Sequence, residues 1–489
     1  MRLGVSFFVT GLVLTIFGVS MLIPLLVDLS APTVGAFGLS SCITLFFGIL
    51  FMLMFRDNYA KLTGREMFLT TTLVWMSVCS FCALPFYFSH NPTHYTDAFF
   101  ETMSGLTTMG ATVMTDLNHT AKGLLLWRAL LQWVGGLGII VIALAILPLL
   151  RIGGMQLFSL ESSDKSGKNM PKTSQIIATL MMVYVSITIL CILSLFIAGM
   201  SQFDAVAYAL TTVPSGGFAP YDSSAALLTA TQQWVLTFFM FVSGFPLFFL
   251  YFLFARDWER IKNDTQVKTF VLIVFLLCTV LVLWMVQTFP ERSFADIVRT
   301  VAFNVLSIIS TCGMTNEDFM LWGTFPVMVF LFLLPVGGCS GSTAGGFKIF
   351  RLNILYFFTL KNLRMKILPH GVFMMKFNGE PITEDVISGV FLFFSMFLIC
   401  LFASSLALAI CGLDALTAVS GSLSALGNVG PGLGPVIGPA SNYAGLPVPA
   451  KWILCFDMML GRLEYMAVLV LLTPLAWRKE RNKKPIIAF

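Results

Sequence analysis

Charged residues are scarce in this 489-residue chain, in which Asp, Glu, Lys and Arg together make up 11% of the residues. An average soluble domain contains about 25% charged residues. Hydrophobic residues make up 57% of the chain, and a soluble protein of this length could not bury that much apolar surface. The composition excludes an ordinary soluble enzyme, a nucleic-acid-binding protein and a disordered chain. It predicts a protein that resides in a lipid bilayer.

The motifs of enzymes and cofactor sites are also missing. The chain contains no GxSxG or HExxH motif to accompany its many Ser and Thr residues, and no phosphate-binding GxGxxG motif. Most of the ten Cys lie inside apolar stretches, and no cluster of His and Cys has the spacing of a metal site. We therefore expect neither an enzyme nor a chain that binds a nucleotide cofactor itself.

Ten apolar segments are long enough to cross about 30 Å of hydrocarbon as helices. The first begins next to Met1 and has no convincing cleavage site, so we expect a retained helix and not a signal peptide. The ten segments are 4–26, 36–55, 68–88, 124–149, 176–199, 233–255, 269–288, 325–348, 385–410 and 452–475.

The Lys and Arg residues orient these segments, because cytoplasmic loops of membrane proteins are enriched in basic residues. If the N-terminus is cytoplasmic, 23 of the 29 basic residues fall on the cytoplasmic side. Both termini are therefore predicted to be cytoplasmic, and the outer segments are predominantly acidic. The basic residues that fall elsewhere are Lys122, Arg128, Arg292, Arg299 and Lys451 in outer segments and Arg462 within the last span.

Four outer segments share one pattern, in which an Asp precedes a short apolar stretch and a Gly-containing segment. The Asp residues are Asp97, Asp204, Asp296 and Asp414, and the Gly residues that end the pattern lie 13, 13, 17 and 16 residues later. A stretch of about ten residues cannot span the bilayer, so each must enter and return. Irregular backbone at membrane depth is tolerated only inside protein or along water.

Four such segments can close a ring of backbone carbonyls that replaces the hydration shell of a cation. The predicted fold is an all-α polytopic membrane protein with four tandem repeats of membrane helix, pore loop and membrane helix around one pore. An N-terminal two-helix hairpin over 1–60 precedes them. The expected repeats are 61–170, 171–265, 266–378 with a broken second helix, and 379–489 with a basic C-terminal tail.

Several longer motifs resemble those of one family. They are Trp133-Val-Gly135-Gly136-Leu-Gly138 with Ile152-Gly153-Gly154, the Gly-rich run Gly337 to Lys348, the run Met459-Leu460-Gly461-Arg462-Leu463-Glu464, and the loop Gly427 to Pro435. With these motifs the whole chain resembles the Trk/Ktr/HKT superfamily of potassium-uptake membrane subunits, nearest the bacterial TrkH/TrkG type.

The resemblance implies a potassium-conducting uptake subunit in the inner (plasma) membrane of a bacterium. It further implies a homodimer and a cytoplasmic ring partner of the TrkA type, which binds NAD or ATP and controls opening. Members with Gly in all four loops favour potassium, whereas Ser in the first loop goes with sodium. Here all four are Gly, so potassium is the expected ion. The expected filter residues are Thr107, Thr108, Met109, Gly110, Ser215, Gly216, Gly217, Thr311, Cys312, Gly313, Asn428, Val429 and Gly430.

The run 336–346 contains five Gly, each of which costs about 1 kcal/mol in a helix relative to Ala, so this span is predicted to be broken. One interpretation is a flexible loop beneath the filter that closes the pore; the other is a close-packed helix face. The residues expected to form this gate are Gly337, Gly338, Gly341, Ser342, Thr343, Gly345, Gly346 and Arg462.

Arg462 lies deep in the last predicted span, where a charge faces a cavity or a partner. We expect it to form a cationic barrier that holds the gate through backbone carbonyls. A structural ion pair with Asp457 or Glu464 is the alternative, but their spacing from Arg462 does not suit an intrahelical pair.

Three features of the sequence fit two interpretations each. The four Asp residues of the repeat either cap helices, which we favour, or attract cations. The segment from Lys361 to Lys376 either lies along the inner lipid surface or contacts the cytoplasmic partner. Transport is either passive and gated, which we favour, or coupled to protons or sodium as in a secondary symporter. The pore loops offer no titratable group for such coupling.

Overall fold

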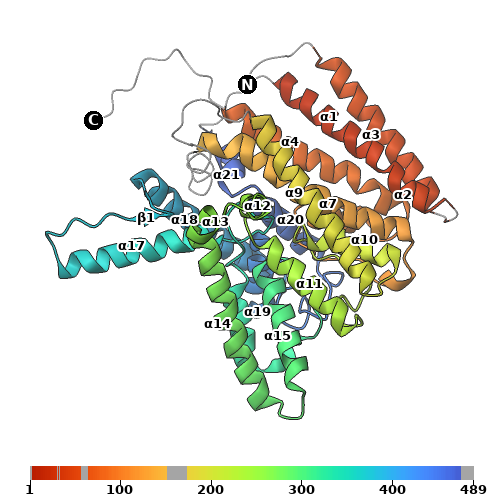
Figure 1. The fold of residues 1–489 in the computed structure, drawn as a ribbon. Coiled ribbons are helices and arrows are strands. Elements are labelled where there is room, and N and C mark those ends of the chain that lie inside the picture. Colours follow the sequence, from red (N-terminus) through yellow and green to blue (C-terminus); the bar gives the residue numbers. More distant parts are fainter. Residues whose placement is uncertain (1–2, 30, 32, 57–63, 151–172, 475–489) are drawn as a thin grey trace, which may run out of the picture.

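The computed structural model describes residues 3–29, 31, 33–56, 64–150 and 173–474 of the chain. These residues form a predominantly helical protein, as the composition predicts (Figure 1). Within them, six helices are long and apolar enough to cross a membrane, and a seventh span is present if one sharply bent pair of helices is counted. The Ile152-Gly153-Gly154 motif lies outside the described residues.

The N-terminal hairpin packs through small residues. The helices α1 (Leu3–Ser20) and α3 (Val34–Met54) approach so closely at Gly11 and Gly48 that a Cβ at Gly11 would lie 2.7 Å from the Gly48 carbonyl oxygen. The buried Asp28, at the end of α2 (Leu22–Val27), accepts a 2.8 Å hydrogen bond from the Gly123 backbone N–H. This bond attaches the hairpin to the start of α7 (Lys122–Leu150).

Behind the hairpin, the chain repeats one plan: a long helix, a short helix and a second long or broken helix. The remaining elements in chain order are α4 (Gly64–Cys82), α5 (Leu84–Phe88), α6 (Tyr95–Leu106), η1 (Leu117–His119), α9 (Thr173–Ile197), α10 (Gln202–Thr212), α11 (Ala230–Ser243), α12 (Leu247–Phe254), α13 (Trp258–Asn263), α14 (Thr265–Thr288), α15 (Phe294–Ile309), η2 (Phe319–Trp322), α16 (Thr324–Leu333), α17 (Ile349–Ile367), β1 (Lys376–Phe377), β2 (Glu380–Pro381), α18 (Glu384–Ile410), α19 (Ala415–Gly427), α20 (Val448–Arg462) and α21 (Met466–Leu472).

Two spans that were expected to be continuous are interrupted, and a third, 325–348, is interrupted at the Gly-rich run where a break was expected. The span 233–255 is two helices, α11 and α12, bent by 103° at a break that contains Gly244 and Pro246. Because Pro has no N–H and clashes with the preceding turn, the helix cannot continue through Pro246. In 325–348, α16 ends at Leu333 and the Gly-rich residues that follow are not helical. The last span breaks between α20 and α21, where Glu464 and Tyr465 both have positive φ.

The short helices α6, α10, α15 and α19 are the re-entrant segments of the repeat pattern. Helix capping by their Asp residues was expected, but only Asp414 is an N-cap, accepting from the Thr417 N–H at 3.1 Å. Asp97, Asp204 and Asp296 are each the third residue of their helices instead. A carboxylate in the first turn still interacts favourably with the positive end of the helix dipole. This interaction explains why an Asp occurs near the start of each short helix even where it is not the N-cap.

We expect replacement of Asp414 by Ala to lower the free energy of unfolding by about 1 kcal/mol, as for other lost N-caps. The hydroxyl and the backbone N–H of Thr417 hold the pKa of Asp414 below its usual value. The stabilisation is therefore present at neutral pH and is lost as the pH falls through the lowered pKa. Thermal unfolding in detergent at pH 7 checks this. Asp414→Asn serves as the control, because Asn caps about as well, and an equal loss in both variants would contradict the capping role.

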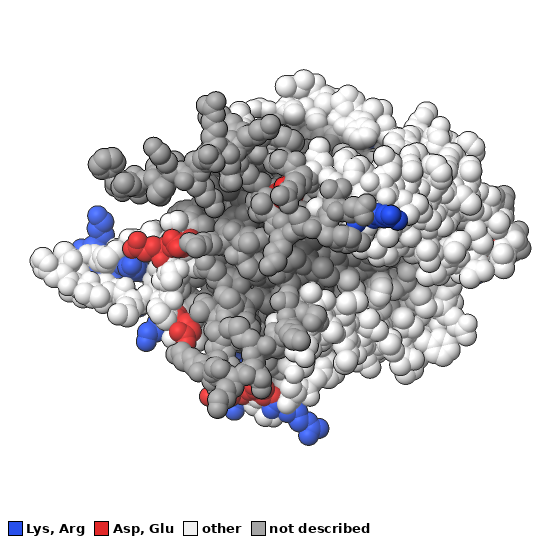
Figure 2. All heavy atoms as spheres, turned by 90° about the horizontal axis from the view of Figure 1, so that it is seen from above, with Lys and Arg blue, Asp and Glu red and all other residues white. Residues whose placement is uncertain are grey.

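Helix α17 projects away from the rest of the protein, with the β1–β2 hairpin between it and α18 (Figure 1). Its last turn contains Arg364 and Lys366, whereas Tyr356, Leu363 and Ile367 are at least 57% exposed. Figure 2 shows charged side chains gathered over this projection and along the lower edge of that view, while most of the other described atoms belong to uncharged residues. An apolar helix bearing bases at its end suits a membrane surface or a protein partner.

Candidate ion-conduction site

The four Gly residues of the repeat meet in one closed ring. An added Cβ at Gly110 would lie 2.1 Å from the Gly216 carbonyl oxygen, and a Cβ at Gly217 would lie 1.7 Å from that of Cys312. The series continues from Gly313 to the Val429 oxygen at 2.1 Å and from Gly430 to the Met109 oxygen at 2.8 Å. Each glycine therefore faces the carbonyl that precedes the glycine of the next repeat, and the fourth repeat returns to the first.

The backbone of the four loops has the same unusual conformation. Each ring glycine has a positive φ, between +78° and +116°. The residue two positions earlier also has a positive φ in every loop, although none of these is Gly: Thr108, Ser215, Thr311 and Asn428. Non-Gly residues rarely adopt this conformation, and such strain clusters at functional sites. Its recurrence at the same position in all four loops, with four different residues or sequence contexts, indicates a shared structural requirement.

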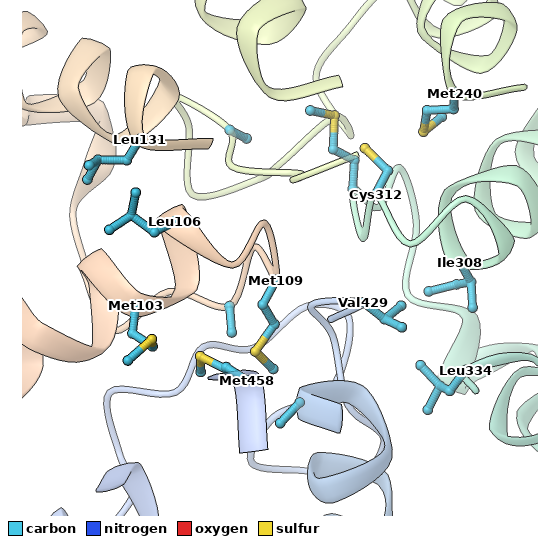
Figure 3. Packing of buried hydrophobic residues seen from close by; sticks show 14 of the residues in the cluster. Met103, Leu106, Met109, Leu131, Met240, Ile308, Cys312, Leu334, Val429 and Met458 are labelled. Carbon is cyan, nitrogen blue, oxygen red and sulfur yellow. The ribbon is translucent and has the colours of Figure 1, made fainter. Parts of the chain in front are cut away.

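The short helices end immediately before the loops. Helices α6, α10, α15 and α19 end three to five residues before Gly110, Gly217, Gly313 and Gly430, respectively. Since the C-terminal end of a helix carries partial negative charge, all four helix ends favour a cation at the ring. The side chains of Met109, Cys312 and Val429 are buried in the packing around the loops (Figure 3). The Thr107 hydroxyl donates to the Met103 carbonyl at 2.7 Å, within its own helix.

An open cavity of about 200 Å³ borders one side of the ring. The residues that follow the four glycines line it, together with Asp222 and the segment from Gly438 to Tyr443. The Tyr443 hydroxyl donates to the Gly430 carbonyl at 2.7 Å, and the Tyr443 N–H donates to the Thr112 carbonyl at 2.8 Å. Tyr443 therefore connects the fourth loop to the first, a link that the sequence pattern did not reveal.

The Gly-rich segment after α16 forms a loop whose two ends are joined by backbone hydrogen bonds. Phe347 donates to Pro335 at 2.8 Å, and Lys348 donates to Val336 at 3.0 Å. The ends approach so closely that a Cβ at Gly346 would lie 2.8 Å from the Gly337 Cα. Gly is therefore required here because two parts of the same loop approach each other closely. The glycines do not form the close-packed helix face that was the alternative interpretation.

This loop touches the ring loops of three repeats. The Gly345 N–H donates to the Thr311 hydroxyl at 2.8 Å, and the Thr343 and Ser215 hydroxyls are 3.0 Å apart. A Cβ at Gly345 would lie 2.3 Å from the Gly427 carbonyl. Of the other residues expected in the gate, Ser342 bonds within the loop, and Gly341 accepts from Leu247 at the start of α12. The loop therefore lies directly against the ring, on the side where the short helices end.

Arg462 joins this loop to α7. Its guanidinium is 2% exposed and donates to the Thr343 carbonyl at 3.3 Å and to the Gly135 carbonyl at 3.0 Å. The two acids considered as alternative partners bind elsewhere. Glu464 accepts from Arg351 at 2.6 Å and Lys348 at 3.3 Å, and Asp457 accepts from Ser404 at 2.5 Å. Arg462 is thus a buried cation that contacts the loop through backbone carbonyls.

Four charged residues of the predicted outer segments prove to be buried: Asp28, Glu101, Arg128 and Lys451. Lys451 contacts Asp97 at 2.6 Å, and Glu101 contacts Arg128 at 2.7 Å. Counting charges by side of the membrane missed these pairs, because it treats every residue outside a predicted span as solvated. Each pair joins the short helix α6 to a neighbouring long helix, a contact that the local sequence does not mark.

Comparison with known proteins identifies close relatives. A sequence model of the TrkH family, described as cation transport protein, matches residues 36–477. The Trk system potassium uptake protein TrkI of Halomonas elongata is 41% identical, with 96% of each chain covered. The Trk system potassium uptake protein TrkH of Escherichia coli K12 is 35% identical over 96% of this chain and 98% of the relative. The crystal structure of the potassium transporter TrkH from Vibrio parahaemolyticus superposes with a TM-score of 0.89 at 33% identity, covering 98% of this chain and all of that one.

Proposed function

Because the chain belongs to the TrkH family of cation transport proteins, we propose that it is the ion-conducting subunit of a bacterial potassium-uptake system. Relatives at 41% and 35% identity carry the name Trk system potassium uptake protein. The observation that carries the proposal is the closed ring of Gly110, Gly217, Gly313 and Gly430, in which each glycine packs against a backbone carbonyl of the next loop. Backbone carbonyls in a ring replace the water lost by a dehydrated cation.

In this mechanism potassium enters through the outer cavity and passes the ring formed by the thirteen expected filter residues. The Gly-rich loop, with Thr343 and Gly345 against the ring, closes the path below it. Arg462 adds a positive charge there and holds the loop by the Thr343 carbonyl. Opening then requires the loop to leave the ring, which breaks these few hydrogen bonds. Flux is passive and follows the electrochemical gradient.

Coupled transport with protons or sodium is the second candidate function. It would require a titratable group on the path. The buried carboxyl of Asp457 is the group to consider, since one of its oxygens has no hydrogen-bond partner. Its other oxygen faces Ser404 on α18, which places it on the α18 side of α20 and away from the ring. This placement favours passive conduction.

The remaining parts of the proposal concern assembly and organisation. We assign residues 1–60 to the hairpin and 61–170, 171–265, 266–378 and 379–489 to four pore repeats. The orientation is inner membrane with both termini cytoplasmic. The projecting α17 supports a homodimer, because a lone helix with exposed apolar residues needs a second surface (Figure 1). The relatives' name, Trk system, fits a partner such as a cytoplasmic TrkA-type ring that supplies NAD or ATP control.

Tracer potassium uptake into liposomes that contain only this purified chain tests the function. With potassium loaded inside and sodium in equal excess on both sides, we expect tracer uptake to persist without a pH or sodium gradient, since a carbonyl ring conducts passively. Empty liposomes and liposomes with heat-denatured protein are the controls. Uptake that appears only with an imposed proton or sodium gradient would favour the symporter instead.

A further inference from the structure

We propose that Glu101, Arg128 and Gln132 form a buried clamp that holds the first two loops of the ring in position and thereby sets the preference for potassium over sodium. This inference rests on the proposed function. The three side chains come from two elements, with Glu101 on the short helix α6 and the others one turn apart on α7. All three are 0 to 2% exposed. They are positioning residues, because they act on the loop backbone and not on the ion.

On the first loop, the Glu101 carboxylate binds the two residues Thr112 and Val113, which follow the ring glycine Gly110. One oxygen accepts from the Thr112 hydroxyl at 2.9 Å, and the other accepts from the Val113 N–H at 2.9 Å. Thr112 is two residues beyond Gly110. The carboxylate therefore fixes the outer part of the first loop against the helix that leads into it.

On the second loop, Arg128 and Gln132 form hydrogen bonds with three backbone groups between residues 216 and 219. The Gln132 amide donates to the Gly216 carbonyl at 2.7 Å and accepts from the Phe218 N–H at 3.0 Å. Arg128 donates to the Ala219 carbonyl at 3.0 Å, and its guanidinium lies 4.1 Å from the centre of the Phe218 ring. These contacts surround Gly217 on both sides.

The Arg128–Glu101 pair, at 2.7 Å, joins the two halves of the clamp. A buried ion pair is weak evidence for stability, because its desolvation offsets most of the attraction. Its bonds to loop backbone instead indicate a geometric role. Charged and bidentate hydrogen bonds define orientation more sharply than apolar packing does.

The clamp has no charged equivalent in the other loops as the structure describes them. Nine residues before each ring glycine, the place of Glu101 is taken by Tyr208, Asn304 and Gly421. Tyr208 donates to the Ser224 carbonyl at 2.6 Å, and Asn304 contacts Asn316 at 2.6 Å. The first and second loops are therefore the ones whose backbone is held by a buried ion pair. Sodium is smaller than potassium, so the ring carbonyls would have to move inward to coordinate it. Loops that are held in place prevent this movement and thereby exclude sodium.

The clamp is tested by the ratio of potassium to sodium flux in liposomes, for three variants that pass size-exclusion chromatography as wild type does. Gln132→Met removes both amide bonds to the second loop without leaving a buried charge. The double variant Glu101→Gln/Arg128→Met removes the ion pair while keeping the site neutral. We expect each to lower the ratio about tenfold, with potassium flux per folded protein largely kept. Arg128→Lys, which keeps the charge but has a single donor group, should give an intermediate ratio.

Glu317→Gln is the matched control, because it also alters an Arg–Glu pair but at a partly exposed site, where Glu317 binds Arg292. We expect its ratio to equal that of wild type. A merely structural role would lower both fluxes together, so an unchanged ratio in folded Gln132→Met or the double variant overturns the clamp. If the double variant does not fold, the flux ratios of Gln132→Met and Arg128→Lys test the clamp. Absence of potassium preference in the wild-type chain would instead refute the proposed function.

Discussion

Replacement of Arg462 by Ala is expected to raise potassium flux through the reconstituted chain by about tenfold or more. The guanidinium is buried and bridges two carbonyls, those of Thr343 in the Gly-rich loop and Gly135 in α7. Ala removes a positive charge from the path of a cation and releases the loop from α7. Both effects lower the barrier, and the measurement is the initial rate of tracer uptake at equal amounts of folded protein.

Arg462→Lys separates the two effects. Lys retains the charge but cannot bridge the two carbonyls with a planar fork of donors. A flux near that of wild type would assign the barrier to charge, and a flux near that of Arg462→Ala would assign it to the bridge. An unchanged flux in Arg462→Ala itself would falsify the gating role, because it would mean that neither the charge nor the contact limits conduction.

Two features of the fold could be predicted from the sequence: the four short re-entrant helices and the location in a membrane. Four copies of one pattern, each too short to span, predicted four re-entrant segments, and the apolar composition predicted the membrane. The ring glycines could be aligned because each must adopt a positive φ beside a carbonyl of the next repeat. Because this requirement places a glycine at the same position of each repeat, the four positions can be aligned from a single sequence.

The contacts between repeats could not be predicted in the same way. Glu101 and Arg128 are separated by 27 residues, and Gln132 reaches the Gly216 carbonyl, 84 residues away. Nothing in the local sequence marks them as partners, because their pairing depends on how α7 packs against two loops at once. The bend of 103° between α11 and α12 was missed for a related reason. Hydropathy averages over a window in which Gly244 and Pro246 count little, although they end the helix.

Replacement of Gly217 by Ala is expected to reduce potassium uptake at least a hundredfold. The added methyl group would lie 1.7 Å from the Cys312 carbonyl oxygen and 2.8 Å from its carbon. Both are backbone atoms of the next loop, so no flexible side chain can move aside. A displacement of about 1 Å in positioned groups can cost a hundredfold in rate, and here the displaced carbonyl belongs to the proposed coordination ring. Tracer uptake at equal amounts of folded protein measures the loss.

Gly412→Ala separates crowding from backbone strain. Gly412 has a φ of +91°, close to the +78° of Gly217, but no atom lies within 4 Å of the position that its Cβ would take. Both substitutions therefore incur the same left-handed penalty for an L-residue, about 1–2 kcal/mol. If uptake falls only in Gly217→Ala, the loss arises from contact with the neighbouring loop, as a closed ring requires. Equal losses would mean that strain alone is responsible, and the contact between Gly217 and the Cys312 carbonyl would then have no part in conduction.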